Sequence, residues 1–318
     1  MSRNFKYARE KVQGILFGTF VGDVLGARFE GQNPEQIPPL DMEFLTENST
    51  GIYTDDTQMT ISVLEEMVEN GSIIQSSLQQ RFQKRFSRWR GYGGGMLEVI
   101  EYWRSGIEVQ SAAKKIYGGA GSFGDGAAMR IAPLSAFFDL GERDDLIEQV
   151  IKCSEITHVH SYGISGAILQ AYGVLLALND VAVNDWLDYF FELPIESAYK
   201  IKLESVIRAL ERQPSPQECA KIIGNSPEAM QAVPSAVYSV MRNHKSFADT
   251  ISFAIGMGGD TDTIGAMAGA ISGAKLGYSE IPDKWIKMLE NDFEGKDFIN
   301  ELINRGYEKR RGEDSNLR

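Results

Sequence analysis

The helical character of the chain is clearest in residues 256–277, GMGGDTDTIGAMAGAISGAKLG. The paired glycines Gly258 and Gly259 indicate a turn, and the apolar residues that follow recur at helical spacing. These apolar residues are Ile264, Met267, Ala268 and Ile271. The cluster Asp260-Thr261-Asp262-Thr263 stands between the turn and the apolar stripe. The stretch therefore predicts a helix over 262–276 with carboxylates and hydroxyls at its start.

A second acidic cluster, Thr54-Asp55-Asp56-Thr57, lies far upstream and also begins a predicted helix, 55–69. Thr54 is a suitable N-cap, and acidic residues in a first helical turn complement the helix dipole. The long segment between the two clusters contains no other cluster like them. The two clusters are therefore candidates for a shared site.

Two interpretations of the clusters are open at this point. They can be ordinary helix caps, or they can hold a metal ion together. One cap needs only one side chain, whereas each cluster offers four polar ones, and adjacent aspartates repel each other unless solvent or a cation relieves them. Carboxylate and hydroxyl oxygens are hard ligands of the kind that Mg²⁺ or Mn²⁺ prefers. We therefore predict a site for one or two such ions, formed if the fold brings the clusters together.

Helical periodicity dominates the rest of the chain, and alternating strand patterns are scarce. Helices are predicted at 6–27, 55–69, 75–90, 95–105, 144–156, 162–178, 197–212, 227–243, 247–257, 262–276 and 295–307. Irregular segments are predicted at 31–53, 91–94 and 117–126. No Pro- or Ser-rich linker divides the chain. We predict one compact all-α domain, residues 1–310, followed by a solvated tail, 311–318.

Composition restricts the class of protein. The net charge of −12 argues against a broad nucleic-acid-binding surface. The sequence contains no run of about 18 continuous apolar residues, the length that a membrane span needs. The N-terminus lacks the apolar core of a signal peptide. Cys153 and Cys219 are far apart and are best explained as free thiols in a reducing compartment. We expect a cytoplasmic monomer that binds neither nucleic acid nor membrane.

The first predicted helix carries three glycines four residues apart, Gly18, Gly22 and Gly26. Glycines on one helical face allow another helix to approach closely, so we expect a packing role for them. Asp23 lies among apolar residues and needs a partner, because a buried unpaired carboxylate is costly. We expect it to cap another helix. Taken alone, Glu30 fits an ordinary surface glutamate at a helix end.

Two glycine-rich segments follow, RGYGGG at 90–95 and YGGAGSFGDG at 117–126. Their exposed amides can bind phosphate oxygens, and the aromatic side chains of Tyr117 or Phe123 can stack on a planar base. Neither segment has the preceding strand of a Rossmann motif or the Lys-Ser/Thr ending of a P-loop. A simple flexible connection is the alternative for both.

Two of the three histidines occur in THVHS, residues 157–161. A zinc site is not supported, because no third soft ligand lies nearby. His158 precedes a predicted helix and is a candidate to hydrogen-bond a ligand. No Ser-His-Asp or Cys-His nucleophile system can be assembled from the sequence.

Taken in order, these motifs resemble those of the ADP-ribosylglycohydrolase family, which includes dinitrogenase reductase-activating glycohydrolase. The matching segments are GDVLGARFEG at 22–31, YTDDTQMT at 53–60, GSFGDGAAMR at 121–130, THVHS at 157–161 and GMGGDTDTIGAMAGAISGAKLG at 256–277. They span nearly the whole chain. The segment RGYGGGMLEV at 90–99 and the loop at Tyr117 are more similar to the poly(ADP-ribose) and serine-ADP-ribose hydrolase branch than to the arginine branch.

The resemblance implies an all-α fold with two Mg²⁺ or Mn²⁺ ions in a cleft. The implied metal ligands are Thr54, Asp55, Asp56, Asp260, Asp262 and Thr263. The implied catalytic residues are Glu30, Asp55 and Asp262, with Glu30 as the acid or base beside the metals. The candidate substrate-binding residues are Gly93, Gly94, Tyr117, Gly121, Ser122, Phe123, Gly124, Asp125 and His158. Asp125 is a departure, because the family commonly has asparagine at this position, and a carboxylate would repel the diphosphate that the loop is expected to hold.

The resulting hypothesis is a metal-dependent hydrolase that cleaves the glycosidic bond of ADP-ribosylated proteins or peptides and releases ADP-ribose. Serine-linked ADP-ribose or poly(ADP-ribose) is the favoured substrate class, and arginine-linked ADP-ribose is the alternative. Two other classes stay open: a non-catalytic ADP-ribose-binding or immunity protein, and a dimetal phosphohydrolase that acts on a pyrophosphate.

Overall fold

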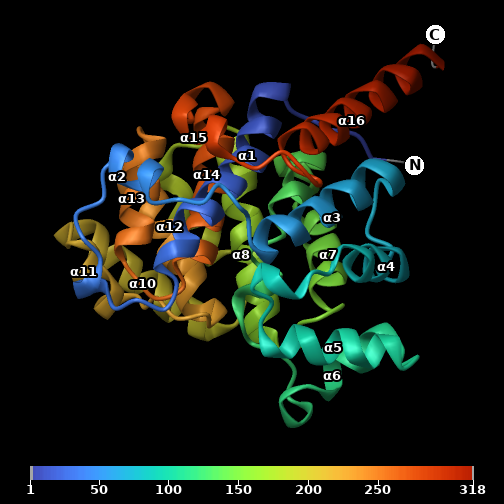
Figure 1. The fold of residues 1–318 in the computed structure, drawn as a ribbon, viewed down its shortest axis with the longest axis horizontal. Coiled ribbons are helices and arrows are strands. Elements are labelled where there is room, and N and C mark those ends of the chain that lie inside the picture. Colours follow the sequence, from blue (N-terminus) through green and yellow to red (C-terminus); the bar gives the residue numbers. More distant parts are fainter. Residues whose placement is uncertain (1–2, 317–318) are drawn as a thin grey trace.

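A computed structural model describes residues 3–316, with side chains described as far as residue 309. Within this range the chain forms helices and no strands, apart from one isolated bridge between Gly124 and Glu228. The α-helices are α1 (Arg9–Gly26), α2 (Met42–Glu47), α3 (Asp55–Asn70), α4 (Gln75–Arg85), α5 (Gly94–Arg104), α6 (Val109–Lys115), α7 (Arg143–Ser154), α8 (Ser161–Leu178), α9 (Trp186–Phe191), α10 (Ser197–Arg212), α11 (Pro216–Ile222), α12 (Ala229–Asn243), α13 (Phe247–Gly256), α14 (Thr261–Leu276), α15 (Asp283–Met288) and α16 (Lys296–Asn316). The predicted all-α class is confirmed (Figure 1).

Helices α1 and α14 pack antiparallel with their backbones in contact, because glycines face each other along both helices. A Cβ atom placed on Gly14, Gly18 or Gly22 would lie 2.1, 2.2 and 2.0 Å from the carbonyl oxygens of Gly273, Gly269 and Gly265 respectively. No side chain larger than hydrogen fits at such a distance. The expected packing role of the α1 glycines is confirmed, and it fixes the register between the two helices.

This register places the end of α1 beside the start of α14. A Cβ atom on Gly26 would lie 2.2 Å from the carbonyl oxygen of Thr261. The Thr261 hydroxyl donates a 2.8 Å hydrogen bond to the carbonyl oxygen of Gly26. Glu30, just after α1, and the acidic cluster 260–263 are therefore held in the same region of the molecule.

The buried Asp23 of α1 attaches the first turn of α3 to the same region. Its carboxylate accepts hydrogen bonds from the backbone nitrogen atoms of Thr54 and Thr57, at 3.0 Å each, and from the Thr57 hydroxyl at 2.6 Å. Asp23 thus caps the N-terminus of α3, as expected from the sequence. Together with the glycine contacts, this cap brings both acidic clusters to one end of α1.

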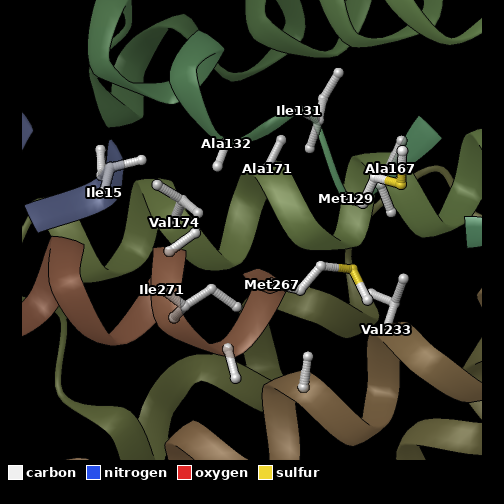
Figure 2. Packing of buried hydrophobic residues seen from close by; sticks show 14 of the residues in the cluster. Ile15, Met129, Ile131, Ala132, Ala167, Ala171, Val174, Val233, Met267 and Ile271 are labelled. Atoms are coloured by element: carbon white, nitrogen blue, oxygen red, sulfur yellow. The ribbon is translucent and has the colours of Figure 1, made fainter. Parts of the chain in front are cut away.

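The apolar core forms where α8 crosses α14 and α12 (Figure 2). Met267 and Ile271 of α14 face α8, and Val233 of α12 lies nearby (Figure 2). Helix α8 has the length and apolar composition of a membrane-spanning helix, but 83% of its residues are buried inside the protein. It lies centrally among the other helices (Figure 1), as a core helix of a globular protein does.

Some predicted boundaries differ from the structure. The predicted helix 75–90 ends at Arg85 as α4 and continues only as a short 3₁₀ turn, and the predicted irregular segment 31–53 contains α2. The short helices α6, α9, α11 and α15 have fewer than eight residues each and carry too little periodic pattern to be recognised. Helix α16 runs to Asn316, beyond the predicted end at 307. Exposure of the predicted tail 311–318 lies outside the described side chains.

Candidate active site

A cavity of about 670 Å³ lies where several helices begin. Its lining includes residues at or just before the N-termini of α3, α5, α8, α12 and α14. The N-terminus of a helix presents unpaired backbone N–H groups and a partial positive charge. Convergence of these ends therefore makes the cavity suitable for anionic groups, although the dipoles alone do not balance the carboxylates described below.

Three loops around the cavity are joined by backbone hydrogen bonds. The backbone nitrogen of Gly31 donates a 2.7 Å hydrogen bond to the carbonyl oxygen of Gly259. The backbone nitrogen of Gly259 donates a 2.9 Å hydrogen bond to the carbonyl oxygen of Gln32. The nitrogen of Asp260 donates to the carbonyl oxygen of Asn225 at 2.8 Å. The loop after Glu30, the turn before α14 and the segment before α12 therefore form one connected wall.

Carboxylates from both acidic clusters meet in this cavity. Burial, followed by the charges of Asp23 and Asp260, raises the pKa of Asp55 to about 8. Burial and neighbouring carboxylates also raise the pKa values of Asp56 and Asp262 well above the ordinary range. Each shift has the same physical cause, which is negative charge held in a poorly solvated place without enough positive charge to offset it.

Glu30 stands at the more exposed edge of this group. Partial burial, and after it the charge of Asp260, raises the pKa of the Glu30 carboxyl. Glu30 lies in the cavity wall, where the charge of Asp260 affects its pKa. This position suits a group that exchanges protons with a bound molecule. Glu30 is therefore part of the site and not an isolated surface glutamate.

In the described part of the chain, two buried carboxylate oxygens have no hydrogen-bond partner, Oδ1 of Asp56 and Oδ2 of Asp125. A buried, unpartnered carboxylate oxygen is costly, and a divalent cation is the partner that hard oxygen ligands accept. Among the described residues, no three Asp, Glu, His or Cys side chains already form a closed metal-binding group. The donor set thus fits a hard cation in its chemistry, but its side chains would have to rotate to surround one.

Not every member of the two clusters faces the cavity. Thr57 bonds to Asp23 and Thr261 bonds to the end of α1, so both hydroxyls are used in packing. Thr54 does not line the cavity itself; its hydroxyl donates to Oδ2 of Asp56 at 3.0 Å and accepts from the Asp56 nitrogen. Thr54 is the N-cap of α3, as predicted.

Arg130 is the one cationic residue among the described residues that line the cavity. It is fully buried, and its guanidinium donates to the carbonyl oxygens of Gly126 and Cys153 and to the hydroxyl of Thr157. These bonds join the glycine-rich loop to the segment before α8. Because the nitrogen atoms that bond are committed to neutral acceptors, Arg130 does not pair directly with the carboxylates.

His158 is held in its neutral form beside this arginine. Desolvation in the cavity wall, and then the charge of Arg130, lowers the pKa of His158 to about 3. Its Nδ1 lies 2.8 Å from the hydroxyl of Thr157, which already accepts from Arg130. If the threonine hydroxyl donates onward to Nδ1, Nε2 carries the proton and is a donor for a bound ligand.

Aromatic side chains flank the open side of the cavity. Tyr117 is 58% exposed and Phe123 is 43% exposed, and both belong to the lining. Tyr117 has a positive φ of 50°, an uncommon conformation for a residue other than glycine. Its ring packs over Gly95, where an added Cβ would lie 2.8 Å from the tyrosine hydroxyl. The first turn of α5 therefore holds this ring at the cavity rim.

Comparison with known proteins places the chain in a family. The family model described as ADP-ribosylglycohydrolase matches residues 6–316. The chain belongs to the ADP-ribosylglycohydrolase family. It is therefore a hydrolase of glycosyl bonds, and the family resemblance predicted from the sequence is confirmed.

Several relatives of this ADP-ribosylglycohydrolase are similar along nearly their whole length. The "ADP-ribosylhydrolase ARH3" of Xenopus tropicalis is 32% identical over 92% of this chain and 94% of the relative. The protein of the same name from Homo sapiens is 26% identical over 94% of each chain. A solved "ADP-ribosylglycohydrolase-related protein complex" has a TM-score of 0.70 at 22% identity, covering 93% of this chain and 95% of that chain, which shows a shared fold.

Most of the predicted site residues of this ADP-ribosylglycohydrolase meet in the one cavity. Those that line it are Glu30, Asp55, Asp56, Gly93, Tyr117, Ser122, Phe123, Gly124, Asp125, His158, Asp260, Asp262 and Thr263. Three do not: Thr54, Gly94 and Gly121. Gly121 instead packs against the segment before α8, where an added Cβ would lie 2.3 Å from Val159. Gly94 has open space around it at the start of α5.

Sequence reasoning missed one wall of the cavity, Asn225 to Glu228. We predicted that the helix begins at residue 227, whereas α12 begins at Ala229. The letters GNSP at 224–227 are turn residues and were the available signal. Met59, Met96 and Met129 also line the cavity, but an apolar residue at helical spacing looks like core in a sequence.

Proposed function

We propose that this enzyme is a metal-dependent ADP-ribosylglycohydrolase that cleaves the bond between the anomeric ribose carbon and an acceptor, releasing ADP-ribose. The observation that carries the proposal is the meeting of Glu30 with carboxylates from two distant helix starts in a single cavity. Beside them lie glycine-rich loops and exposed aromatic rings. A cavity of about 670 Å³ is in the size range that accommodates a small organic ligand.

The proposed cofactor is a pair of Mg²⁺ or Mn²⁺ ions held by Thr54, Asp55, Asp56, Asp260, Asp262 and Thr263. Bound in this place, such ions would neutralise the carboxylates, bind ribose hydroxyls and lower the pKa of a water molecule. The unpartnered oxygen of Asp56 and the raised pKa values of Asp55 and Asp262 support this assignment, because each indicates uncompensated negative charge. Thr54 would act largely by positioning Asp56, to which it is hydrogen-bonded.

Glu30 is the proposed acid or base. A carboxyl with a raised pKa at the edge of the cavity can take a proton from an attacking water or give one to the leaving oxygen. The bond that breaks joins the ribose carbon to the acceptor oxygen, and the bond that forms joins the same carbon to the water oxygen. Asp55 and Asp262 would stabilise positive charge that develops on the ribose.

The remainder of the ADP-ribosyl group is assigned to the loops. Backbone N–H groups at Gly93, Ser122 and Phe123 would bind the diphosphate, whereas those of Gly121, Gly124 and Asp125 already donate to acceptors within the protein. Tyr117 and Phe123 would pack against the adenine, and Nε2 of His158 would donate to a ribose oxygen. None of these contacts requires a side-chain cation.

The favoured acceptors are serine or another oxygen-linked group, or poly(ADP-ribose). Support comes from the glycine segment 90–95 and the loop at Tyr117, and from relatives named ADP-ribosylhydrolase ARH3. Arginine-linked ADP-ribose is the alternative substrate. We further propose a cytoplasmic monomer that acts on ADP-ribosylated proteins or peptides and not at a membrane. The net charge of −12 supports the absence of nucleic-acid binding.

Product analysis tests this proposal. Peptides carrying ADP-ribose on serine or on arginine would be incubated with the enzyme and Mg²⁺, and the products separated by chromatography. We expect free ADP-ribose, faster from serine. AMP would instead indicate a pyrophosphate hydrolase, and binding without any product would indicate a non-catalytic ADP-ribose-binding or immunity protein.

A further inference from the structure

Asp125 has a backbone that the fold holds in one place. Its nitrogen donates to the carbonyl oxygen of Pro227 at 3.1 Å, and its own carbonyl oxygen accepts from the nitrogens of Ala128 and Met129 at 2.7 and 3.0 Å. These bonds fix a 3₁₀ turn, Asp125–Ala127, to the wall formed before α12. The fold therefore fixes the position of the Asp125 backbone and the direction of its Cα–Cβ bond.

The Asp125 side chain points into the carboxylate group and not toward solvent. The residue is only 6% exposed, and Oδ2 has no hydrogen-bond partner among the described residues. Asp260 and Asp56 line the same cavity, and both lie close enough for their charges to act on the Asp125 carboxylate. The guanidinium of Arg130 lines the same cavity, but its hydrogen bonds go to the carbonyl oxygens of Gly126 and Cys153 and to the Thr157 hydroxyl.

This placement is difficult to reconcile with a role at the diphosphate. A third carboxylate next to Asp260 and Asp56 adds repulsion, and no described cationic side chain forms an ion pair with it. A buried carboxylate is retained only when a cation, hydrogen-bond donors or protonation compensates its charge. Asp125 and Asp56 share the same unusual feature, one buried oxygen without a donor.

We propose that Asp125 is a further ligand of the cation site. It would bind the ion together with Asp260 and Asp56, and it would add one negative charge to the predicted ligand set. This inference rests on the proposed metal-dependent function, and it replaces our expectation that Asp125 stands beside the diphosphate. A carboxylate in place of an amide makes the site more anionic. The cation site of this enzyme therefore binds divalent ions more tightly than the same site with asparagine.

Calorimetric titration of Mg²⁺ and Mn²⁺ into the full-length, chelator-treated protein tests the inference without substrate. Asp125→Asn keeps the shape of the side chain and removes its charge, so we expect the dissociation constant of the cation to increase by about tenfold or more. Asp188→Asn is the matched control, because it removes the same charge from an exposed position on α9 and should leave cation affinity unchanged. Circular dichroism and thermal unfolding would show that each variant is folded.

A second variant protects the test against misfolding of the first. Asp125→Ala removes both oxygens and leaves no buried amide to satisfy, and it should weaken cation binding at least as much as Asp125→Asn. Unchanged cation affinity in both folded variants would overturn the inference while leaving the metal-dependent function intact. Tighter binding of ADP-ribose by Asp125→Asn, with unchanged cation affinity, would place the carboxylate at the diphosphate. A wild-type protein that binds neither cation would overturn the metal-dependent function as well.

Discussion

Gly22 and Gly265 touch backbone to backbone: a Cβ atom on Gly22 would lie 2.0 Å from the carbonyl oxygen of Gly265. The contact is part of the repeated glycine pairing between α1 and α14. It determines how far the end of α1, with Glu30 beyond it, stands from the acidic start of α14. The packing of two glycine faces thus brings distant parts of the chain together at the candidate active site.

The first prediction follows from this contact. Gly22→Ala places a methyl group where a carbonyl oxygen already lies, so the helices must separate, and we expect the free energy of unfolding to fall by about 3 kcal/mol. Denaturant unfolding measures it. Gly94→Ala is the control, because nothing lies within 4 Å of a Cβ there. Equal stability of Gly22→Ala and wild type would mean that α1 and α14 are not packed this closely.

The second prediction concerns Glu30. Glu30→Gln should lower kcat by roughly a hundredfold or more, the usual scale for general acid–base catalysis, while the affinity for ADP-ribose changes far less. Glu35→Gln serves as the control, since Glu35 follows Glu30 closely in the chain and its carboxylate forms an exposed ion pair with Lys221. If binding and turnover fall together, Glu30 positions the ligand or the cation instead. Unchanged turnover would exclude a catalytic role.

The third prediction is a pH dependence of stability in the cation-free protein. Because burial raises the pKa of Asp55 to about 8, and those of Asp56 and Asp262 also rise, the folded chain holds more protons at neutral pH than the unfolded chain does. The stabilisation that these carboxyl groups contribute is fully present below about pH 4, and it is lost as the pH rises through their pKa values in the folded chain. His158, whose pKa is lowered to about 3, acts oppositely, but only below about pH 6.5.

Thermal unfolding in a chelator between about pH 6.5 and about pH 8 follows mainly the carboxylates, because His158 acts below this range and the buried thiols of Cys153 and Cys219, whose pKa values are also raised, act above it. We expect Tm to fall by a few degrees over this range. Excess Mg²⁺ should remove most of the decrease, because a bound cation stabilises the ionised carboxylates. A Tm that rises with pH in the chelator would show that these groups are ionised and paired within the protein.

The fourth prediction tests the link from Arg130 to His158. Thr157→Val keeps the shape but removes the hydroxyl that accepts from Arg130 at 2.8 Å, so we expect the free energy of unfolding to fall by about 1–3 kcal/mol. The affinity for ADP-ribose should fall too, since the tautomer of His158 is no longer set. Thr157→Ser retains the hydroxyl and should behave like wild type. If valine is tolerated as well as serine, the hydroxyl does not carry this link.

Much of the fold could be predicted because the long helices have a strong apolar period. The role of Asp23 was also predictable, since an aspartate surrounded by apolar residues needs donors and a helix N-terminus supplies them. The short helix α11 could not be predicted in this way, because a single turn or two carries no readable period. Its local signal was the capping box of Ser215 and Glu218 with Pro216 in the first turn, which an analysis of apolar periods does not detect.

The candidate site was predictable in its residues but only partly in its geometry. The acidic clusters could be recognised from their composition. The neighbouring sequence, however, does not indicate that Thr57 and Thr261 turn away from the cavity and hydrogen-bond to α1. The depth of Asp125 was hidden too, because its neighbours are brought to it by packing and lie far away in sequence. Long-range packing decides both outcomes.

We propose that both acidic clusters hold the cation on which glycosidic cleavage depends. The most direct measurement is the release of ADP-ribose from a serine-ADP-ribosylated peptide, before and after exhaustive chelation, and again after Mg²⁺ is restored. We predict that chelation stops the release of ADP-ribose and that Mg²⁺ restores it. The variants Asp55→Ala and Asp262→Ala should release no ADP-ribose even with Mg²⁺, although both keep their helical content. Undiminished release by the wild-type enzyme after chelation would contradict the account.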